Sequence, residues 1–457
     1  MTSIAEAEAA PRLAMPPRPA RPLSTWQLLK VGLANSLATC DEELFDELIV
    51  ERRFFARRAF VVSDPDGVRR VLQDNYDNYP RLQQVRRVFH FGTGTGMLSA
   101  EGDLWRRHRR LINPTLDYRA VQADVLALIG FANEVAALLS ELPQGQPIDI
   151  GKAAAQFISR ATSFLFAGDD RRVDPMVQTM AKYPGRFSLL DVLPFPGPLD
   201  IIARLLGGRR EAQRFKRLMC ELIAERRRDD YAGGKDLLWR LVQARDRNTG
   251  DGLTDAELCD EILSLANTAV TPLRVLNWIW YLLALHPHVE ARLHAELDAV
   301  LGGRAPEFEE FPKLPYLRQV IDETMRIYPP LPVMVRTALA ADEVCGWTIP
   351  KGAIVTIAPW IIHRHRRLWD DPDRFDPDRF GPEASRGRSR YVYIPFSIGP
   401  HICTGAPLSI VQMTIAVAIW AQRFRFHLVP GHPIEPVGWT SLRPGRGIMV
   451  TVEARNR

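Results

Sequence analysis

Long segments whose apolar residues recur with the period of an α-helix constrain the fold of this chain more than any other feature. They cover residues 120–139, 209–227, 256–285, 288–301, 316–328 and 406–421. Shorter runs typical of strands lie toward the two ends of the chain, at residues 59–63, 343–349, 353–357 and 448–452. The pattern predicts a mainly α fold with a smaller β region.

Length and composition are those of an ordinary globular protein. The chain has 457 residues, of which 46% are apolar and 25% are charged. Residues 1–22 are rich in Ala, Pro and Arg and contain no apolar run typical of a signal peptide. We expect residues 1–25 to form a flexible or surface-docked N-terminal arm, and residues 26–457 to form a single domain. The most apolar stretch, residues 278–285, is too short to cross a bilayer, so no transmembrane segment is expected.

Charge and cysteine content exclude two further classes of protein. The 59 Lys and Arg residues against 54 Asp and Glu give a net charge of only +5, and no basic block is interleaved with aromatic residues, so nucleic acid is not an expected partner. The five cysteines are widely spaced, odd in number and without a CxxC pair, which disfavours a disulfide framework or a structural zinc site. They are Cys40, Cys220, Cys259, Cys345 and Cys403. We expect a reducing compartment and a cytoplasmic location.

One of these cysteines stands at the start of an apolar helix. Cys403 lies in the run Phe-Ser-Ile-Gly-Pro-His-Ile-Cys-Thr-Gly, residues 396–405, where backbone N–H groups and the helix dipole favour a thiolate and a lowered pKa. Gly399 and Gly405 bracket the cysteine, and glycine permits a positive φ or the close approach of a flat ligand. The alternative is that Cys403 is one more small buried apolar residue.

The same run resembles the haem-binding loop of the cytochrome P450 family, Phe-x-x-Gly-x-Arg/His-x-Cys-x-Gly. Phe396, Gly399, His401, Cys403 and Gly405 match its constrained positions. The resemblance implies the family's fold, as found in its soluble bacterial members. It also implies that the Cys403 thiolate binds the iron of haem b, with the haem between the loop and the helix at residues 256–285.

A second group of residues resembles the family's structural network. Glu323 and Arg326 lie three residues apart on the helix at residues 316–328, and Arg379 follows in Phe-Asp-Pro-Asp-Arg-Phe. An exposed pair of this kind contributes only about 0.2–0.5 kcal/mol to stability. The resemblance implies instead a buried network of one carboxylate and two guanidinium groups, with a structural role.

Four residues are expected to hold the haem propionates. Trp105 and Arg109 lie on one helical face and resemble the family's propionate-binding pair. Arg336 occupies the position of another propionate-binding arginine, and His401 replaces the more common arginine of the cysteine loop. Most of the basic run at residues 106–110 is interpreted as a solvated face, which could dock an acidic ferredoxin.

The helix at residues 256–285 departs from the family pattern at the oxygen-binding position. The family usually carries Ala/Gly-Gly-x-Asp/Glu-Thr-Thr, of which Thr271 is retained, while Thr268, Val270 and Pro272 replace the glycine, the acid and the second threonine. A proline inside a helix leaves the carbonyl four residues earlier without its donor, so we expect a local kink. Our hypothesis is that Thr271 donates a proton at the oxygen site and that water or Thr268 replaces the acid.

The substrate region is the least constrained part of the sequence. Five residues are expected by resemblance to line an apolar pocket, namely Val270, Val333, Met334, Ser441 and Leu442. The proline-rich apolar segment at residues 183–208 is a candidate lid, and the glycine-rich residues 92–97 are expected to form a flexible loop near the substrate. His363 and His365 are expected to be surface or packing residues, because a metal site needs further ligands.

The function implied by the resemblance is that of a haem-thiolate monooxygenase, which inserts one oxygen atom from O₂ into a lipophilic small molecule. Electrons would come from NAD(P)H through a ferredoxin and a ferredoxin reductase, because no flavin or iron–sulfur segment is present in this sequence. The missing acid leaves two alternatives open. One is a peroxide-using hydroxylase or a haem-thiolate isomerase or dehydratase, and the other is a non-enzymatic haem-binding sensor.

Overall fold

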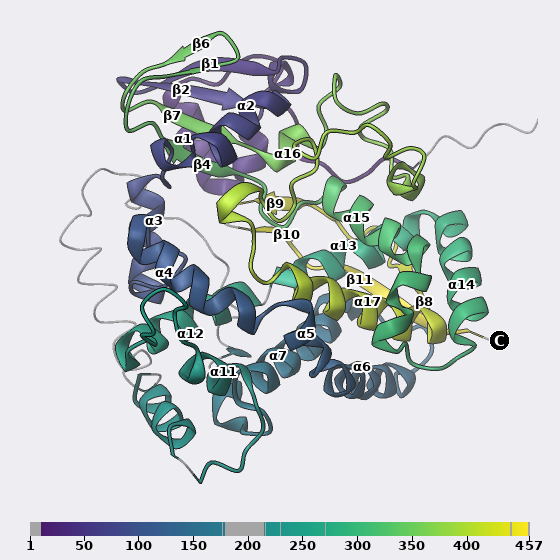
Figure 1. The fold of residues 1–457 in the computed structure, drawn as a ribbon. Coiled ribbons are helices and arrows are strands. Elements are labelled where there is room, and N and C mark those ends of the chain that lie inside the picture. The colour runs from purple at the N-terminus through teal and green to yellow at the C-terminus, as the bar shows by residue number, and fades with distance from the viewer. Residues whose placement is uncertain are drawn as a thin grey trace, which may run out of the picture.

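The computed structural model describes residues 11–175, 177–178, 214, 216–228, 230–269, 271–438 and 441–455. A mainly helical body adjoins a smaller part built around a four-stranded sheet, which lies at the top of Figure 1. This is the predicted mainly α fold with a smaller β region. The candidate lid at residues 183–208 lies outside the described residues.

The described helices are dominated by long segments in the middle and C-terminal parts of the chain. They are α1 (Thr25–Ala34), α2 (Pro65–Arg69), α3 (Gln83–Thr93), α4 (Gly102–Ile112), α5 (Tyr118–Gln122), α6 (Val125–Ser140), α7 (Ile150–Ala167), α11 (Leu237–Gln243), α12 (Asp255–Ala269), α13 (Thr271–Leu285), α14 (Pro287–Leu301), α15 (Pro315–Ile327), α16 (Pro359–Ile362) and α17 (Ala406–Arg423). Residues 216–226 are also helical.

The main sheet has the strand order β1-β2-β7-β4. Its strands are β1 (Ile49–Phe54), β2 (Arg57–Val62), β7 (Ile354–Ile357) and β4 (Met334–Thr337), with β2 and β7 parallel and the other two pairings antiparallel. Phe60, Val62, Val355 and Ile357 are fully buried on one face and form part of a separate hydrophobic cluster. The sheet is therefore a second packing unit beside the helical core.

Three smaller sheets complete the β structure. They pair β5 (Asp342–Val344) with β6 (Trp347–Ile349), β9 (Pro436–Gly438) with β10 (Leu442–Pro444), and β3 (Ile148–Asp149) with β11 (Met449–Ala454) and β8 (Phe424–Leu428). The single strand predicted at residues 343–349 is therefore wrong. Cys345 and Gly346 both have positive φ, 49° and 80°, and this two-residue turn folds the segment into a hairpin.

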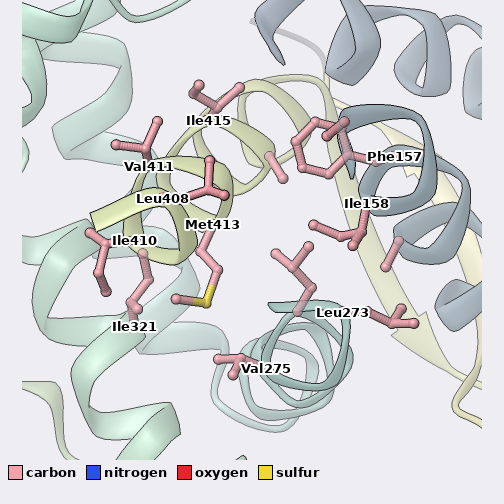
Figure 2. Packing of buried hydrophobic residues seen from close by; sticks show 14 of the residues in the cluster. Phe157, Ile158, Leu273, Val275, Ile321, Leu408, Ile410, Val411, Met413 and Ile415 are labelled. Atoms are coloured by element: carbon pink, nitrogen blue, oxygen red, sulfur yellow. The ribbon is translucent and has the colours of Figure 1, made fainter. Parts of the chain in front are cut away.

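The helical core forms where α7, α13 and α17 meet. Figure 2 shows side chains of these helices converging, with Leu273 and Val275 of α13 opposite Met413 of α17. Helix α7 begins after Asp149, whose carboxylate accepts the Gly151 N–H, and ends at Gly168 with φ 61°. Cap residues and buried apolar side chains together fix this helix.

Two predicted helices differ from the structure in their extent. The predicted helix at residues 120–139 is divided into α5 and α6, and at the junction the Asp124 carboxylate accepts a hydrogen bond from Arg240 at 2.9 Å. The predicted helix at residues 256–285 corresponds to α12 and α13, which lie on either side of Val270. Because Val270 is outside the described residues, the expected kink at Pro272 stays a prediction.

Residues 13–18 of the N-terminal arm contact the body of the protein. The Ala14 N–H donates to the Tyr281 hydroxyl at 2.9 Å, and the Ala14 carbonyl accepts from the Tyr328 hydroxyl at 2.9 Å. Arg18 pairs with Asp373 at 3.0 Å. Residues 13–18 are therefore docked on the body, whereas residues 1–10 lie outside the described residues, and the division into an arm at residues 1–25 and a single domain at residues 26–457 stays a prediction. Among the described helices, none is by itself long and apolar enough to span a membrane.

Candidate active site

The cysteine loop is a tight turn closed by its own backbone. The Cys403 N–H donates to the Phe396 carbonyl at 2.8 Å, and the backbone between them passes through positive φ at Ser397 and Gly399, 62° and 73°. Ser397 adopts this conformation although it is not a glycine, which costs energy that the surrounding structure must supply. The loop therefore holds Cys403 at a fixed point directly before α17.

The two glycines of the loop serve different purposes. A Cβ on Gly399 would lie 2.2 Å from the Leu72 carbonyl oxygen, so both the positive φ and the close backbone packing require glycine. Gly405 has φ −83°, and a Cβ there would meet the Cys403 sulfur only at an ordinary 3.9 Å. The expected positive φ is thus found at Gly399 and not at Gly405, where the close approach of a flat ligand stays a prediction.

The expected lowering of the Cys403 pKa is not found in the chain alone. Burial raises the pKa of this thiol, while the N–H groups of Gly405 and Ala406 and the Arg109 guanidinium act in the opposite direction. Cys403 is nevertheless exposed, so the raised pKa reflects the density of protein around the sulfur and not its removal from solvent. A bound metal cation would favour the thiolate further, which the N–H groups already support.

Helix α4 connects the cysteine loop to α12 through consecutive residues. Arg109 donates to the Thr404 hydroxyl at 2.9 Å, next to Cys403. On the neighbouring position, His108 Nδ1 lies 2.6 Å from Glu261 Oε1 of α12. One helix therefore fixes the cysteine loop relative to the helix that carries the oxygen-site residues.

The indole of Trp105 packs against the cysteine loop. Its ring stacks on the His401 ring with centroids 3.8 Å apart. Burial, followed by the nearby charges of Arg81, Arg336 and Arg109, lowers the pKa of His401 to about 2, so this histidine is neutral. It contributes a neutral hydrogen-bonding ring to the site and not a charge.

Arg81 is a site residue that the sequence analysis missed. Its guanidinium lies 3.1 Å from His401 Nδ1 and donates to Glu101 Oε1 at 3.1 Å. Its backbone forms a bridge with that of Arg336. Arg81 follows Pro80 in a loop where no period or motif marks it, so only the three-dimensional arrangement reveals its place.

The arginines beside the cysteine loop outnumber their carboxylates. The positive charges of three arginines, Arg81, Arg109 and Arg336, all act on the pKa of His401, and the charge of Arg81 also acts on that of Arg336. Among the described residues, only Glu101 forms an ion pair with one of these arginines, Arg81. Arg336 is 7% exposed, and burial lowers its pKa to about 10. Three cations against one anion leave a buried excess of positive charge, which is costly unless an anionic ligand binds. The two propionates of haem fit this excess.

Replacing Arg336 by glutamine is expected to weaken haem retention about tenfold to a hundredfold, because a buried charge-assisted hydrogen bond contributes about 1.5–3 kcal/mol. The measurement is the rate of haem transfer from the purified holoprotein to apomyoglobin. Arg58→Gln, which removes an exposed arginine paired with Glu51, is the matched control. Equal transfer rates for the two variants would contradict the assignment of Arg336.

The three residues of the expected structural network come together in a buried position. Arg326 donates to both oxygens of Glu323, at 2.6 and 2.8 Å, and both side chains are fully buried. Arg379 Nε lies 3.5 Å from the same carboxylate. The Asp376 N–H also donates to Glu323, at 2.9 Å. The network therefore attaches the segment around Asp376 to α15.

This network continues to the cysteine loop through His363. Arg326 donates to the His363 carbonyl at 2.7 Å, and the His363 Nε2 accepts the Ile394 N–H at 2.9 Å, two residues before Phe396. His363 and His365 are both fully buried. Of the two roles expected for these histidines, surface or packing, the structure therefore shows packing.

The basic run of α4 is not a free positive patch. Arg106 pairs with Asp77 at 3.0 Å, Arg107 with Glu257 at 2.7 Å, and Arg110 with Asp246 at 2.7 Å. The side chains of Arg106 and Arg110 are 38% and 41% exposed, which fits the expected solvated face, and the docking of a ferredoxin there stays a prediction.

The oxygen-site residues lie on α12 and at the start of α13. Thr268 is exposed, and its hydroxyl donates to the Leu265 carbonyl at 2.9 Å and to the Ser264 carbonyl at 3.2 Å. Thr271 is the first residue of α13 and is half-buried. The Thr268 hydroxyl therefore bonds to its own helix in this state.

Four of the five expected pocket residues are described by the structure, and they divide into two groups. Met334 and Leu442 are 5% and 0% exposed and lie inside the two hydrophobic clusters, so their side chains serve packing. Val333 and Ser441 are half-buried and remain candidates for the pocket, whereas Val270 lies outside the described residues.

The glycine-rich loop expected to be flexible is attached to α12. Asp260 accepts both the Thr95 N–H at 2.8 Å and the Thr95 hydroxyl at 2.9 Å. A Cβ on Gly96 would lie 2.2 Å from the Ser264 hydroxyl, so the loop backbone packs directly on the helix. The glycines permit close packing here and do not indicate mobility.

Comparison with known proteins gives the same answer as the site. A model of the cytochrome P450 family matches residues 16–452. A cyclooctat-9-en-7-ol 5-monooxygenase of Streptomyces melanosporofaciens is 30% identical over 401 residues, 84% of this chain and 83% of that protein. A pentalenene oxygenase of Streptomyces avermitilis is 32% identical over 236 residues, 51% of this chain and 52% of that protein.

The fold is shared with a solved structure. The haem domain of cytochrome P450DA superposes with a TM-score of 0.80 at 21% identity, over 97% of this chain and 98% of that one. The family match extends over almost the whole chain and includes the cysteine loop, the buried Glu323 network and the arginines beside them. The chain therefore belongs to the cytochrome P450 family and is a haem-thiolate monooxygenase.

Proposed function

We propose that this monooxygenase inserts one oxygen atom from O₂ into a lipophilic small molecule, using electrons from NAD(P)H that a ferredoxin reductase and a ferredoxin deliver. The observation that carries the proposal is the Cys403 sulfur beside the buried Arg336 and the half-buried Arg81 and Arg109, which have only one carboxylate partner among the described residues. The two relatives are named for their action on cyclooctat-9-en-7-ol and on pentalenene, which supports a hydrophobic substrate.

Each site residue has a distinct part in this function. Haem bound through Cys403 supplies the activation of dioxygen, which a thiolate ligand favours. The N–H groups of Gly405 and Ala406 stabilise negative charge on the sulfur. Arg336 and Arg109 would hold the propionates as charged donors, with Trp105 and His401 as their stacked support.

Two half-buried residues are the candidates for the substrate pocket. Val333 lies directly before β4, and Ser441 directly before β10, and both are half-buried. An apolar residue and a single hydroxyl suit a lipophilic molecule with few polar groups. The five cysteines are free, which supports the proposed cytoplasmic location.

Thr271→Ala is expected to lower the share of NAD(P)H electrons recovered in product about tenfold or more, because a positioned proton donor contributes at least that factor. The lost electrons should appear as hydrogen peroxide, so product and peroxide are measured against NAD(P)H consumed. Thr249→Ala, at an exposed turn, is the control. Unchanged electron recovery in the Thr271 variant would remove this residue from proton delivery.

The test of the proposal is reconstitution of the holoprotein with a ferredoxin, a ferredoxin reductase and NADPH under O₂. Fatty acids, aromatic compounds, pentalenene and cyclooctat-9-en-7-ol are first screened for a shift of the haem absorption band. Product that carries one atom of ¹⁸O from ¹⁸O₂ supports the proposal. Product formed only with added peroxide, or without any oxidant, would instead assign a peroxide-using hydroxylase or an isomerase.

A further inference from the structure

A polar stripe runs along one face of α12 toward the oxygen site. Glu257, Glu261, Ser264, Thr268 and Thr271 are spaced alternately four and three residues apart. This spacing places side chains on one face of a helix, with only a small drift in angle over each heptad. Four of these residues belong to α12 and Thr271 is the first residue of α13, so the stripe is a row of groups that can carry protons, with its last step between the two helices.

The buried end of the stripe is joined to α4 by His108. Its ring Nδ1 lies 2.6 Å from Glu261 Oε1 and its Nε2 lies 3.4 Å from Glu257 Oε1. The side chains of His108 and Glu261 are fully buried, whereas that of Glu257 is 20% exposed and also pairs with Arg107. His108 thus bridges a carboxylate that reaches solvent and one that does not.

Two atoms of the stripe lack a partner in the interior. Glu261 is fully buried and Ser264 is only 2% exposed. Glu261 Oε2 and the Ser264 hydroxyl nevertheless make no hydrogen bond. A buried polar atom without a partner costs about 1–3 kcal/mol, so such atoms usually bind internal water. Neighbouring unpartnered oxygens one helical turn apart are suited to share one water molecule.

We propose that this stripe is the proton-delivery route that replaces the missing helix acid, leading from His108 through Glu261, Ser264 and Thr268 to Thr271. The proposal rests on the monooxygenase function proposed above. His108 gives the proton on Nδ1 to Glu261, and Glu261 passes one through water to Ser264. Each hydroxyl then donates one proton forward and receives one from behind. The neutral ring that remains carries its proton on Nε2, the nitrogen facing Glu257. A change of tautomer moves this proton to Nδ1, and a proton from solvent then binds at Nε2 and restores the charged ring.

The balanced reaction consumes two protons for each O₂, so the oxygen site needs a route for protons. Oxygen insertion follows RH + O₂ + 2 H⁺ + 2 e⁻ → ROH + H₂O, with the electrons supplied by NAD(P)H. When protons do not reach the oxygen site correctly, the same two electrons and two protons leave as H₂O₂. Burial opposes a charge on His108, but the hydrogen bonds and charges of Glu261 and Glu257 outweigh it and raise its pKa, so the ring is held ready as a proton donor.

The alternative is that the same residues only fasten α4 to α12. Glu261→Gln separates the two roles, because glutamine keeps the hydrogen bond to His108 but cannot carry a proton as a carboxylate does. Ser264→Ala interrupts the stripe without touching His108. Asp255→Asn removes an exposed carboxylate from the first turn of α12, away from the stripe, and is the matched control.

The experiment uses the holoprotein with ferredoxin, reductase, NADPH and cyclooctat-9-en-7-ol as the probe substrate. Glu261→Gln and Ser264→Ala are each expected to lower the ratio of product to NADPH consumed about tenfold, with a matching rise in peroxide, at unchanged haem content and melting temperature. Wild-type ratios in either variant, or a fall in haem content and melting temperature without a change in the ratio, would overturn the route.

A crystal structure of the wild-type holoprotein gives a readout that does not depend on turnover. The proposal requires ordered water within hydrogen-bond distance of both Glu261 Oε2 and the Ser264 hydroxyl, and a dry contact there would overturn it. The turnover measurement on the wild-type protein distinguishes failure of the monooxygenase proposal from failure of the proton route. If the wild-type protein forms no product from any probe, the monooxygenase proposal fails, whereas an active wild type with normally coupled variants refutes only the route.

Discussion

Replacing Glu323 by alanine is expected to lower the free energy of unfolding by about 3–5 kcal/mol, since it leaves the fully buried Arg326 guanidinium without its carboxylate. The same change frees the Asp376 N–H and the side chain of Arg379. Urea unfolding of the purified protein, followed by far-ultraviolet circular dichroism, measures the loss. Haem content should fall in parallel, because the network continues through His363 to the cysteine loop.

The matched control lies on the same helix. Arg318 pairs with Asp322 at 2.8 Å, but the Arg318 side chain is 47% exposed. Arg318→Ala is therefore expected to cost no more than about 1 kcal/mol. If the two variants lost similar amounts of stability, the buried network would not have the structural role assigned to it.

Replacing Gly399 by alanine is expected to displace the cysteine loop and to abolish normal haem binding. An alanine at φ 73° is strained by about 1–3 kcal/mol, and its Cβ would lie 2.2 Å from the Leu72 carbonyl oxygen, a backbone atom that cannot move aside by rotating. The loop must therefore shift as a unit and take Cys403 with it. Haem content and the spectrum of the reduced protein with carbon monoxide measure the effect.

Gly387→Ala is the control that separates the strain of a positive φ from the steric clash of the added Cβ. Gly387 has φ 77°, almost the same as Gly399, but a Cβ there meets nothing within 4 Å. The Gly387→Ala variant should therefore lose only the free energy of unfolding that corresponds to the strained φ, and it should retain its haem. An equal loss of haem in both variants would show that the packing against Leu72 is not what fixes the loop.

The sequence predicted those parts of the molecule that depend on local patterns. The long helices, the strands at both ends and the cysteine loop could be located because period, caps and fixed spacing are properties of neighbouring residues. Residues 343–349 show where this fails. A run of strand-forming residues does not reveal that Cys345 will adopt a positive φ and fold the segment back on itself.

The site itself depended more on contacts that are distant in sequence. Arg81 reaches His401 across 320 positions, and His108 reaches Glu261 across 153. The acidic partners of the basic run of α4 could not be predicted for the same reason, because Asp77, Asp246 and Glu257 come from other segments.

The bond between the Cys403 sulfur and the haem iron underlies the function, the loop geometry and the arginine arrangement alike. It is tested most directly by the absorption spectrum of the reduced holoprotein with carbon monoxide, in wild type and in Cys403→Ser. We predict that the wild type shows the band characteristic of thiolate ligation, and that the serine variant loses both this band and all turnover. An unaltered spectrum in the serine variant, or a wild-type protein that binds no haem, would contradict the account.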